Sequence, residues 1–164
     1  MKDTEQVERI TAFLEKIGLE LEFKKLDGST FLPGIHVERG KIQIDKEKLL
    51  YPGDLLHEAG HLALLTPDER MKTSGNIEPG ENKQESMEMG VICWSWAALV
   101  HLQLDPKVVF HDNGYRGASN YYINMYSTGQ CIGLPLLQWA ELCKHQTDPT
   151  DLPAFPHMLK WLRE

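Results

Sequence analysis

The sequence lacks a long apolar run, an excess of positive charge and a paired set of cysteines. No stretch approaches the roughly 20 consecutive apolar residues that a membrane-spanning helix needs, so we expect no membrane span. Acidic residues outnumber basic residues by 24 to 17, which gives a net charge of −7. That charge argues against nucleic acid, or an anionic membrane surface, as the main partner.

Cysteine usage indicates a reducing compartment. The three cysteines are odd in number, widely spaced and without the CxxC spacing of a zinc ribbon (Cys93, Cys131 and Cys143). We therefore expect buried thiols and no disulfides. The N-terminus leads into a charged amphipathic stretch and does not have the pattern of a secretory signal, so the cytoplasm is the expected location. The chain shows no linker or repeat, and 164 residues are expected to form a single domain over 1–164.

The first third of the chain combines one helix with short strands. Apolar residues recur at helical spacing from Val7 to Ile17, and Gly18 follows as a C-terminal cap. Short segments of strand character come next, separated by glycine-containing turns. They cover 19–23, 30–32, 35–37 and 41–44. The turn at 38–41 is typical of a hairpin, and we expect a small antiparallel sheet.

The rest of the chain is predicted to be mostly helical. Asp54 is a candidate N-cap for a helix that ends near Leu65, and 66–69 has the pattern of a capping box that opens the next helix. A loop is expected over 73–82. Further helices are expected over 83–104, with one apolar stripe, then from Pro106, and over 118–126, 135–143 and 156–163. The predicted class is α+β and mostly helical, with a small sheet before the helix at 54–65.

The most informative segment is His57-Glu58-Ala59-Gly60-His61, an HExxH pattern inside an apolar run. Residues four apart project from one face of a helix, so the two imidazoles can bind one metal ion. Glu58 is turned about 100° around the axis from His57, where it can take a proton from a metal-bound water. The apolar run predicts a buried helix, and buried imidazoles and carboxylates need a partner such as a metal. We therefore predict a Zn²⁺ site at His57 and His61, with Glu58 as general base.

Gly60 lies inside this helix, although glycine costs about 1 kcal/mol of helix propensity relative to alanine. Its missing side chain would let a substrate or another backbone come close. A tight contact with a neighbouring helix explains it equally well.

The motif resembles that of the zincin peptidases, in which a third metal ligand follows downstream. The three-histidine signature HExxHxxGxxH is excluded, because Leu64 stands where it needs glycine and Pro67 where it needs histidine. The resemblance to the gluzincin subgroup implies a glutamate from a following helix. Glu85 and Glu88 lie 24 and 27 positions after His61. The longer interval resembles small intracellular HExxH proteins related to phage-repressor-cleaving and stress-response peptidases. It favours Glu88 slightly and leaves Glu85 open.

Residues 110–117 contain two glycines among polar side chains, which suits a loop that lines a site. Zincins commonly use a tyrosine or histidine outside the metal ligands to stabilise an oxyanion. The resemblance therefore implies this role for His111 or Tyr115, with Arg116 as a partner for a substrate carboxylate. An ordinary turn with surface side chains fits the same residues equally well.

A histidine that binds a metal usually donates its second N–H to a carboxylate or carbonyl. Asp112 is one candidate for that outer partner, and the glutamate of the Glu85/Glu88 pair that does not bind the metal is another. We expect His101 to be structural, because a lone histidine on a packed helix rarely binds metal.

Together these expectations predict a zinc-dependent hydrolase. The leading hypothesis is a small intracellular metallopeptidase that acts on a peptide or protein substrate. The resemblance to zincins is specific at the motif and weak elsewhere. The alternative is a non-catalytic zincin-like metal-binding module that acts through protein contacts. Hydrolysis of non-peptide amides cannot be separated from peptide hydrolysis on these residues.

Overall fold

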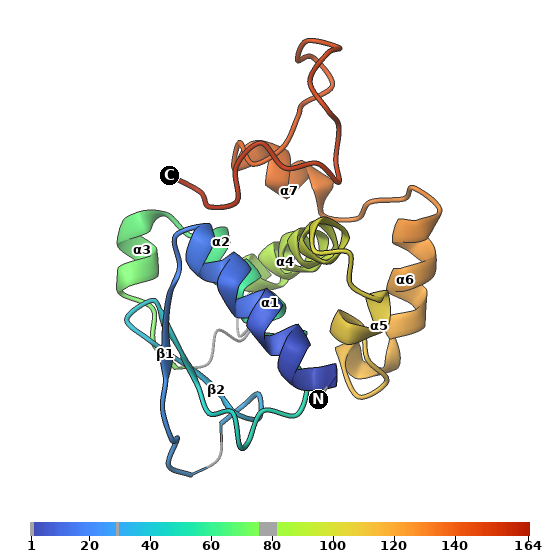
Figure 1. The fold of residues 1–164 in the computed structure, drawn as a ribbon. Coiled ribbons are helices and arrows are strands. Elements are labelled where there is room, and N and C mark those ends of the chain that lie inside the picture. The colour runs from blue at the N-terminus through green and yellow to red at the C-terminus, as the bar shows by residue number, and fades with distance from the viewer. Residues whose placement is uncertain (1, 29, 76–81) are drawn as a thin grey trace.

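Helices provide most of the regular structure and three short strands form one sheet in the computed structural model (Figure 1). The structure describes residues 2–28, 30–75 and 82–164, without the side chains of Lys2 and residues 82–86. The strands are β1 (Glu20–Phe23), β2 (Ile35–Glu38) and β3 (Lys41–Ile44). The helices are α1 (Lys2–Lys16), α2 (Asp54–Ala63), α3 (Pro67–Met71), α4 (Asn82–His101), α5 (Pro106–Val109), the 3₁₀ helix η1 (Tyr115–Gly117), α6 (Ser119–Ser127) and α7 (Leu134–Trp139). The α+β class with a small sheet before the motif helix is confirmed.

The sheet has the strand order β1-β3-β2. The predicted hairpin is confirmed, since β2 and β3 pair antiparallel and the turn residues Arg39 and Gly40 both have positive φ. The prediction of an antiparallel sheet is wrong for β1, which pairs parallel to β3. The outer edge of β2 is occupied by other backbone, because Gly75 N–H donates to the Val37 carbonyl at 2.8 Å. β1 pairs with the edge of β3 that faces away from β2.

Two further predicted segments differ from the structure or lie beyond it. The strand expected over 30–32 is wrong, because only an isolated bridge joins Leu32 to Ile35 across the turn at Pro33-Gly34. Of the loop expected over 73–82, residues 73–75 are non-helical and Asn82 already belongs to α4. Residues 76–81 lie outside the described part of the chain.

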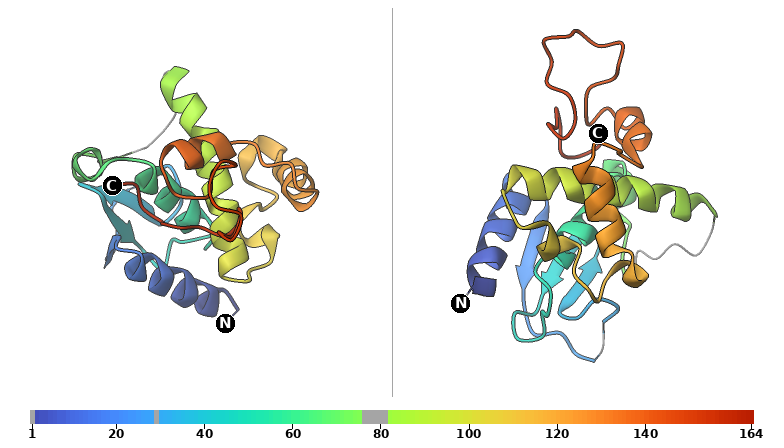
Figure 2. Two further views of the ribbon diagram at one scale, coloured as in Figure 1. Left: turned by 90° about the horizontal axis from the view of Figure 1, so that it is seen from above. Right: turned by 90° about the vertical axis from the view of Figure 1, so that its right-hand side faces the viewer.

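The inner face of the sheet shares one core with α1 and α2. Side chains alternate along the strands as a half-buried sheet requires, so that Val37, Ile42 and Ile44 are buried. They belong to the same cluster as Leu14 of α1 and Leu55 of α2. Figure 2 shows α1 and the sheet on one side of α2 and α4, with α5 and α6 on the other. The sheet thus supports the motif helix from one side only.

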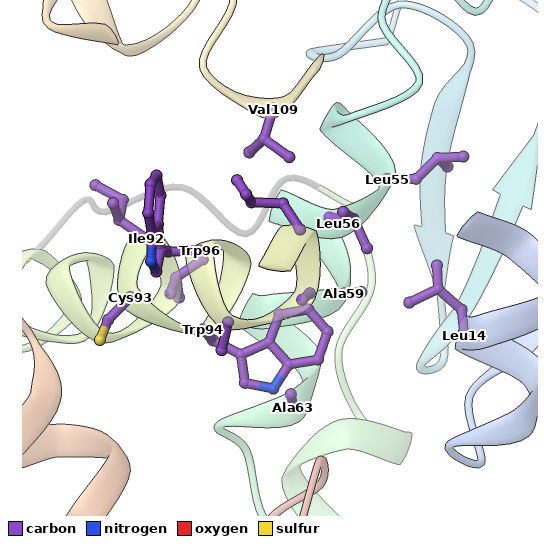
Figure 3. Close-up of a cluster of buried hydrophobic side chains, with 14 of the residues drawn as sticks. Leu14, Leu55, Leu56, Ala59, Ala63, Ile92, Cys93, Trp94, Trp96 and Val109 are labelled. Atoms are coloured by element: carbon purple, nitrogen blue, oxygen red, sulfur yellow. The ribbon is translucent and has the colours of Figure 1, made fainter. Parts of the chain in front are cut away.

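α2 packs directly on α4, and the two helices are in close contact at Gly60. A Cβ atom there would lie 3.0 Å from Val91 Cγ1 and 3.3 Å from Trp94 Cε3. Ala59 and Ala63 of α2 face Trp94 in the same interface (Figure 3). A helix contact therefore accounts for the glycine. The single apolar stripe predicted for α4 is wrong, because residues 90–99 are buried on every side.

The C-terminal segment differs most from prediction. α7 ends at Trp139, short of the predicted Cys143, and the helix expected over 156–163 is absent among the described residues. The backbone there bonds to other segments: Leu159 and Lys160 N–H donate to the Leu142 carbonyl, and Arg163 N–H donates to Ala63. Between α7 and this segment the chain extends away from the helices as a long loop (Figure 2). Tertiary hydrogen bonds have replaced helical ones.

Among the described helices, none is both long and apolar enough to cross a membrane. The capping box is confirmed, since Thr66 accepts from Glu69 N–H and the Glu69 carboxylate accepts from Thr66 N–H. Asp105 caps α5 in the same manner by accepting from Lys107 N–H at 2.9 Å.

Candidate metal centre

α2 presents both motif histidines on one side, as their spacing requires. The rings of His57 and His61 stand nearly perpendicular, at 79°, and their Nε2 atoms lie 3.2 Å apart. The start of this helix corrects a prediction. Asp54 is the first helical residue and not the N-cap, which is Gly53 without a side-chain hydrogen bond. The Asp54 carboxylate is engaged elsewhere, as described below.

Glu88 brings the third donor from α4. Its Oε1 lies 3.1 Å from His57 Nε2, and its Oε2 lies 3.2 Å from His61 Nε2. Val91, which meets Gly60 across the helix interface, is three residues further along the same face of α4. The missing Cβ at Gly60 therefore lets the helices approach closely enough for the carboxylate to reach both imidazoles. His57, His61 and Glu88 form a group that could hold a metal ion.

The donor set suits zinc. Catalytic zinc sites take nitrogen and oxygen ligands at about 2.0–2.2 Å in tetrahedral arrangement, which places the ligand atoms roughly 3.3 Å from one another. Here the two Nε2 atoms lie 3.2 Å apart, and each lies 3.1 or 3.2 Å from a different oxygen of the Glu88 carboxylate. One ligand atom from each residue lies within 4.8 Å of the others. Glu88 Oε2 is buried and finds no partner with hydrogen-bond geometry among the described residues, although His61 is at ion-pair distance. A cation at this point would satisfy that oxygen.

Charges within this cluster shift the pKa values of its members in opposite directions. Burial opposes a charge on His57, but the hydrogen bond and the charge of Glu88 outweigh burial and raise the pKa of the imidazole. Burial also opposes the charge on Glu88, yet the two imidazoles hold the pKa of its carboxyl far below its ordinary value. In the absence of a cation, the Glu88 carboxylate and the His57 imidazole therefore each favour the charged form of the other.

Glu58 lies next to His57 on α2 and is only 8% exposed. Burial raises the pKa of its carboxyl, the nearby imidazoles lower it in part, and Glu88 and Asp54 raise it further. A carboxyl with a raised pKa beside the cluster is suited to exchanging a proton.

His57 Nδ1 has Tyr115 as its hydrogen-bond partner, a contact that the sequence analysis did not predict. The Tyr115 hydroxyl lies 3.2 Å from His57 Nδ1, and the two rings meet edge-on at 79°. Burial raises the pKa of this hydroxyl well above its ordinary value, so it stays protonated. Asp112, which was one candidate for this place, is exposed at the surface. The sequence carried no direct signal for the contact, which joins residues 58 positions apart.

His111 is engaged with the start of the motif helix. Its Nε2 lies 2.8 Å from Asp54 Oδ1, and its ring stacks on Tyr51 with centroids 3.8 Å apart. Burial raises the pKa of the Asp54 carboxyl, and the bond to His111 opposes that shift. His111 Nδ1 is buried without a hydrogen-bond partner in the part of the chain that the structure describes. Asp54 was missed as a site residue, although its place three residues before His57 puts it on the same helix face.

The remaining candidates lie further from the cluster. Arg116 is exposed, and its predicted role toward a substrate carboxylate stays a prediction. Glu85 belongs to α4, but its side chain is outside the described part of the structure. His101 is exposed at the end of α4 and its ring contacts Phe13 and Trp161, in agreement with a structural role.

Comparisons with protein-family models, with curated proteins and with solved structures found no match for this chain. The interpretation of the site therefore depends on its residues and their geometry.

Proposed function

We propose that this protein is a zinc-dependent hydrolase of the zincin type that acts on peptides or proteins. One observation carries the proposal: two imidazole nitrogens and a carboxylate from α2 and α4 converge to within 3.2 Å of one another. His57, His61 and Glu88 would hold the ion. A bound zinc ion supplies a Lewis acid for the scissile carbonyl and lowers the pKa of water to about 7.

Glu58 would move the proton in this reaction. Its carboxylate accepts a proton from the attacking water while the water oxygen bonds to the carbonyl carbon. The same carboxyl then donates that proton to the amide nitrogen as the carbon–nitrogen bond breaks. His57, His61 and Glu88 keep their positions through both steps, because they belong to two helices that pack at Gly60.

The first test is the metal content of the protein purified without chelator. We expect one zinc per chain, bound by wild type and by the Glu58→Gln variant alike. Wild type should cleave members of a mixture of unstructured peptides, with products identified by mass spectrometry, and Glu58→Gln should not. A Glu58→Gln variant that cleaves as fast as wild type would disprove the mechanism.

The same experiment distinguishes a non-catalytic metal-binding module from an enzyme. Zinc-loaded wild type that cleaves no member of the mixture would favour a non-catalytic zincin-like module. Purified protein without metal, which also fails to take up added Zn²⁺, would reject the metal centre itself. Non-peptide amides are offered to the same protein in a parallel assay, and their hydrolysis without cleavage of any peptide would keep the mechanism and change the substrate class.

A further inference from the structure

The contact between Tyr115 and His57 lies on the side of the imidazole that faces away from the cluster. Tyr115 approaches Nδ1 at 3.2 Å, whereas Glu88 approaches Nε2 at 3.1 Å on the opposite edge of the ring. We infer that Tyr115 is a positioning residue that holds the His57 imidazole in its metal-binding orientation, and not a group that contacts substrate. This inference rests on the proposed metal centre and deepens it.

The chemistry of the hydroxyl suits this task. An imidazole that binds a metal through Nε2 carries its proton on Nδ1 and needs an acceptor there. The Tyr115 oxygen can accept that hydrogen bond. In the metal-free protein Nε2 can donate to the Glu88 carboxylate. The Tyr115 hydroxyl then donates to a bare Nδ1 when the ring is neutral, and its oxygen accepts from Nδ1–H when the ring is protonated. A carboxylate, which only accepts, could not bond a bare Nδ1, so a hydroxyl keeps the ring in place in both states.

The backbone around Tyr115 is shaped to deliver the hydroxyl. Tyr115, Arg116 and Gly117 have successive φ values of 55°, 52° and 83°. For the two residues with side chains, this left-handed conformation costs conformational energy and persists only where the surroundings require it. The Tyr115 ring packs against Phe110 and Tyr122, with centroid distances of 4.9 and 5.7 Å.

The segment 111–115 is attached to α2 at two points. His111 bonds Asp54, and Tyr115 bonds His57, which is three residues further along the helix. Ser119 also donates its hydroxyl to the His111 carbonyl at 2.6 Å. Because hydrogen bonds fix both His111 and Tyr115 to α2, this segment can set the direction of the Tyr115 hydroxyl.

The test compares Tyr115→Phe with the matched control Tyr121→Phe on α6, a residue that is 60% exposed. Zn²⁺ is titrated into each metal-free protein, and the ¹⁵N resonance of His57 Nδ1 is recorded without metal. Melting temperatures check that both variants fold. We expect Tyr115→Phe to weaken zinc binding by about 10–100-fold, as loss of an outer partner does elsewhere, and to move the Nδ1 resonance. Tyr121→Phe should change neither.

Wild-type zinc affinity in a folded Tyr115→Phe variant would overturn the inference. If wild type itself binds no zinc, the proposed metal centre fails, and the nitrogen resonance then decides the Tyr115 contact by itself. A resonance unmoved by Tyr115→Phe would reject the contact, whereas one moved by that variant and not by Tyr121→Phe would retain it.

Discussion

Asp54 Oδ1 and His111 Nε2 lie 2.8 Å apart, and this pair joins the first residue of the motif helix to the segment that carries Tyr115. Both side chains are close to nine-tenths buried, at 11% and 12% exposure. The pair therefore bears on the stability of the site without being part of the donor cluster.

Replacing Asp54 by alanine should lower the free energy of unfolding by about 1–3 kcal/mol, because it leaves a buried imidazole N–H without an acceptor. Denaturant unfolding of the metal-free protein measures the change. The control is Asp112→Ala at an exposed position, which should stay within about 0.5 kcal/mol of wild type. Equal losses in the two variants would show that the Asp54–His111 contact is unimportant for stability.

Zinc affinity should distinguish the two glutamates that the sequence left open. Glu88→Gln should weaken zinc binding by more than about 100-fold, since it removes a charged ligand and not only an outer partner. Glu85→Gln is the matched variant one turn earlier on α4 and should bind zinc as wild type does. Isothermal titration measures both, and the reverse order of effects would assign the third ligand to Glu85.

The melting temperature of the metal-free protein should depend on pH through His57 and Glu88. The raised pKa of His57 adds stability that is complete below its ordinary value of 6.5 and is lost as pH rises through the folded value. The lowered pKa of Glu88 adds stability that is present above its ordinary value of 4.5 and is lost as pH falls toward the folded value. Their joint contribution is therefore greatest between pH 4.5 and 6.5.

Bound zinc should oppose the loss of stability that the metal-free protein shows as pH rises above 6.5. The metal needs both imidazoles deprotonated, so the stability that zinc adds grows as pH rises. Calorimetry with and without chelator measures the difference in melting temperature at each pH. A difference that shrinks as pH rises above 6.5 would contradict a site built on His57 and His61.

Gly53 should not tolerate a side chain. Its φ of −65° and ψ of −21° suit any residue, but a Cβ would lie 2.0 Å from the Val108 carbonyl oxygen of α5. Gly53→Ala should therefore destabilise the protein by about 3 kcal/mol or more through overpacking. Gly28→Ala is the contrasting variant, with a φ of 74° and open space around it, and should cost about 1–2 kcal/mol from backbone strain. Thermal unfolding ranks the two, and a larger loss at Gly28 would refute the packing argument.

Local signals in the sequence predicted local structure well. The capping box at Thr66 and the hairpin turn at Arg39-Gly40 depend on hydrogen bonds within a few residues, and both are confirmed. Predictions of structure that depends on distant partners were wrong more often. The parallel pairing of β1 and the irregular C-terminal segment both depend on backbone partners more than 15 residues away, such as Ile42 for Leu21 and Ala63 for Arg163.

The sequence by itself determined that His57 and His61 share one face of a helix, because four residues nearly complete a turn. It also placed Glu58 beside that face. Only the tertiary structure brought Glu88 to the two imidazoles and Tyr115 to His57. Those contacts depend on how closely α2 and α4 approach at Gly60 and on the strained turn at Tyr115. Packing between segments far apart in the chain sets such distances, and no spacing within either segment encodes them.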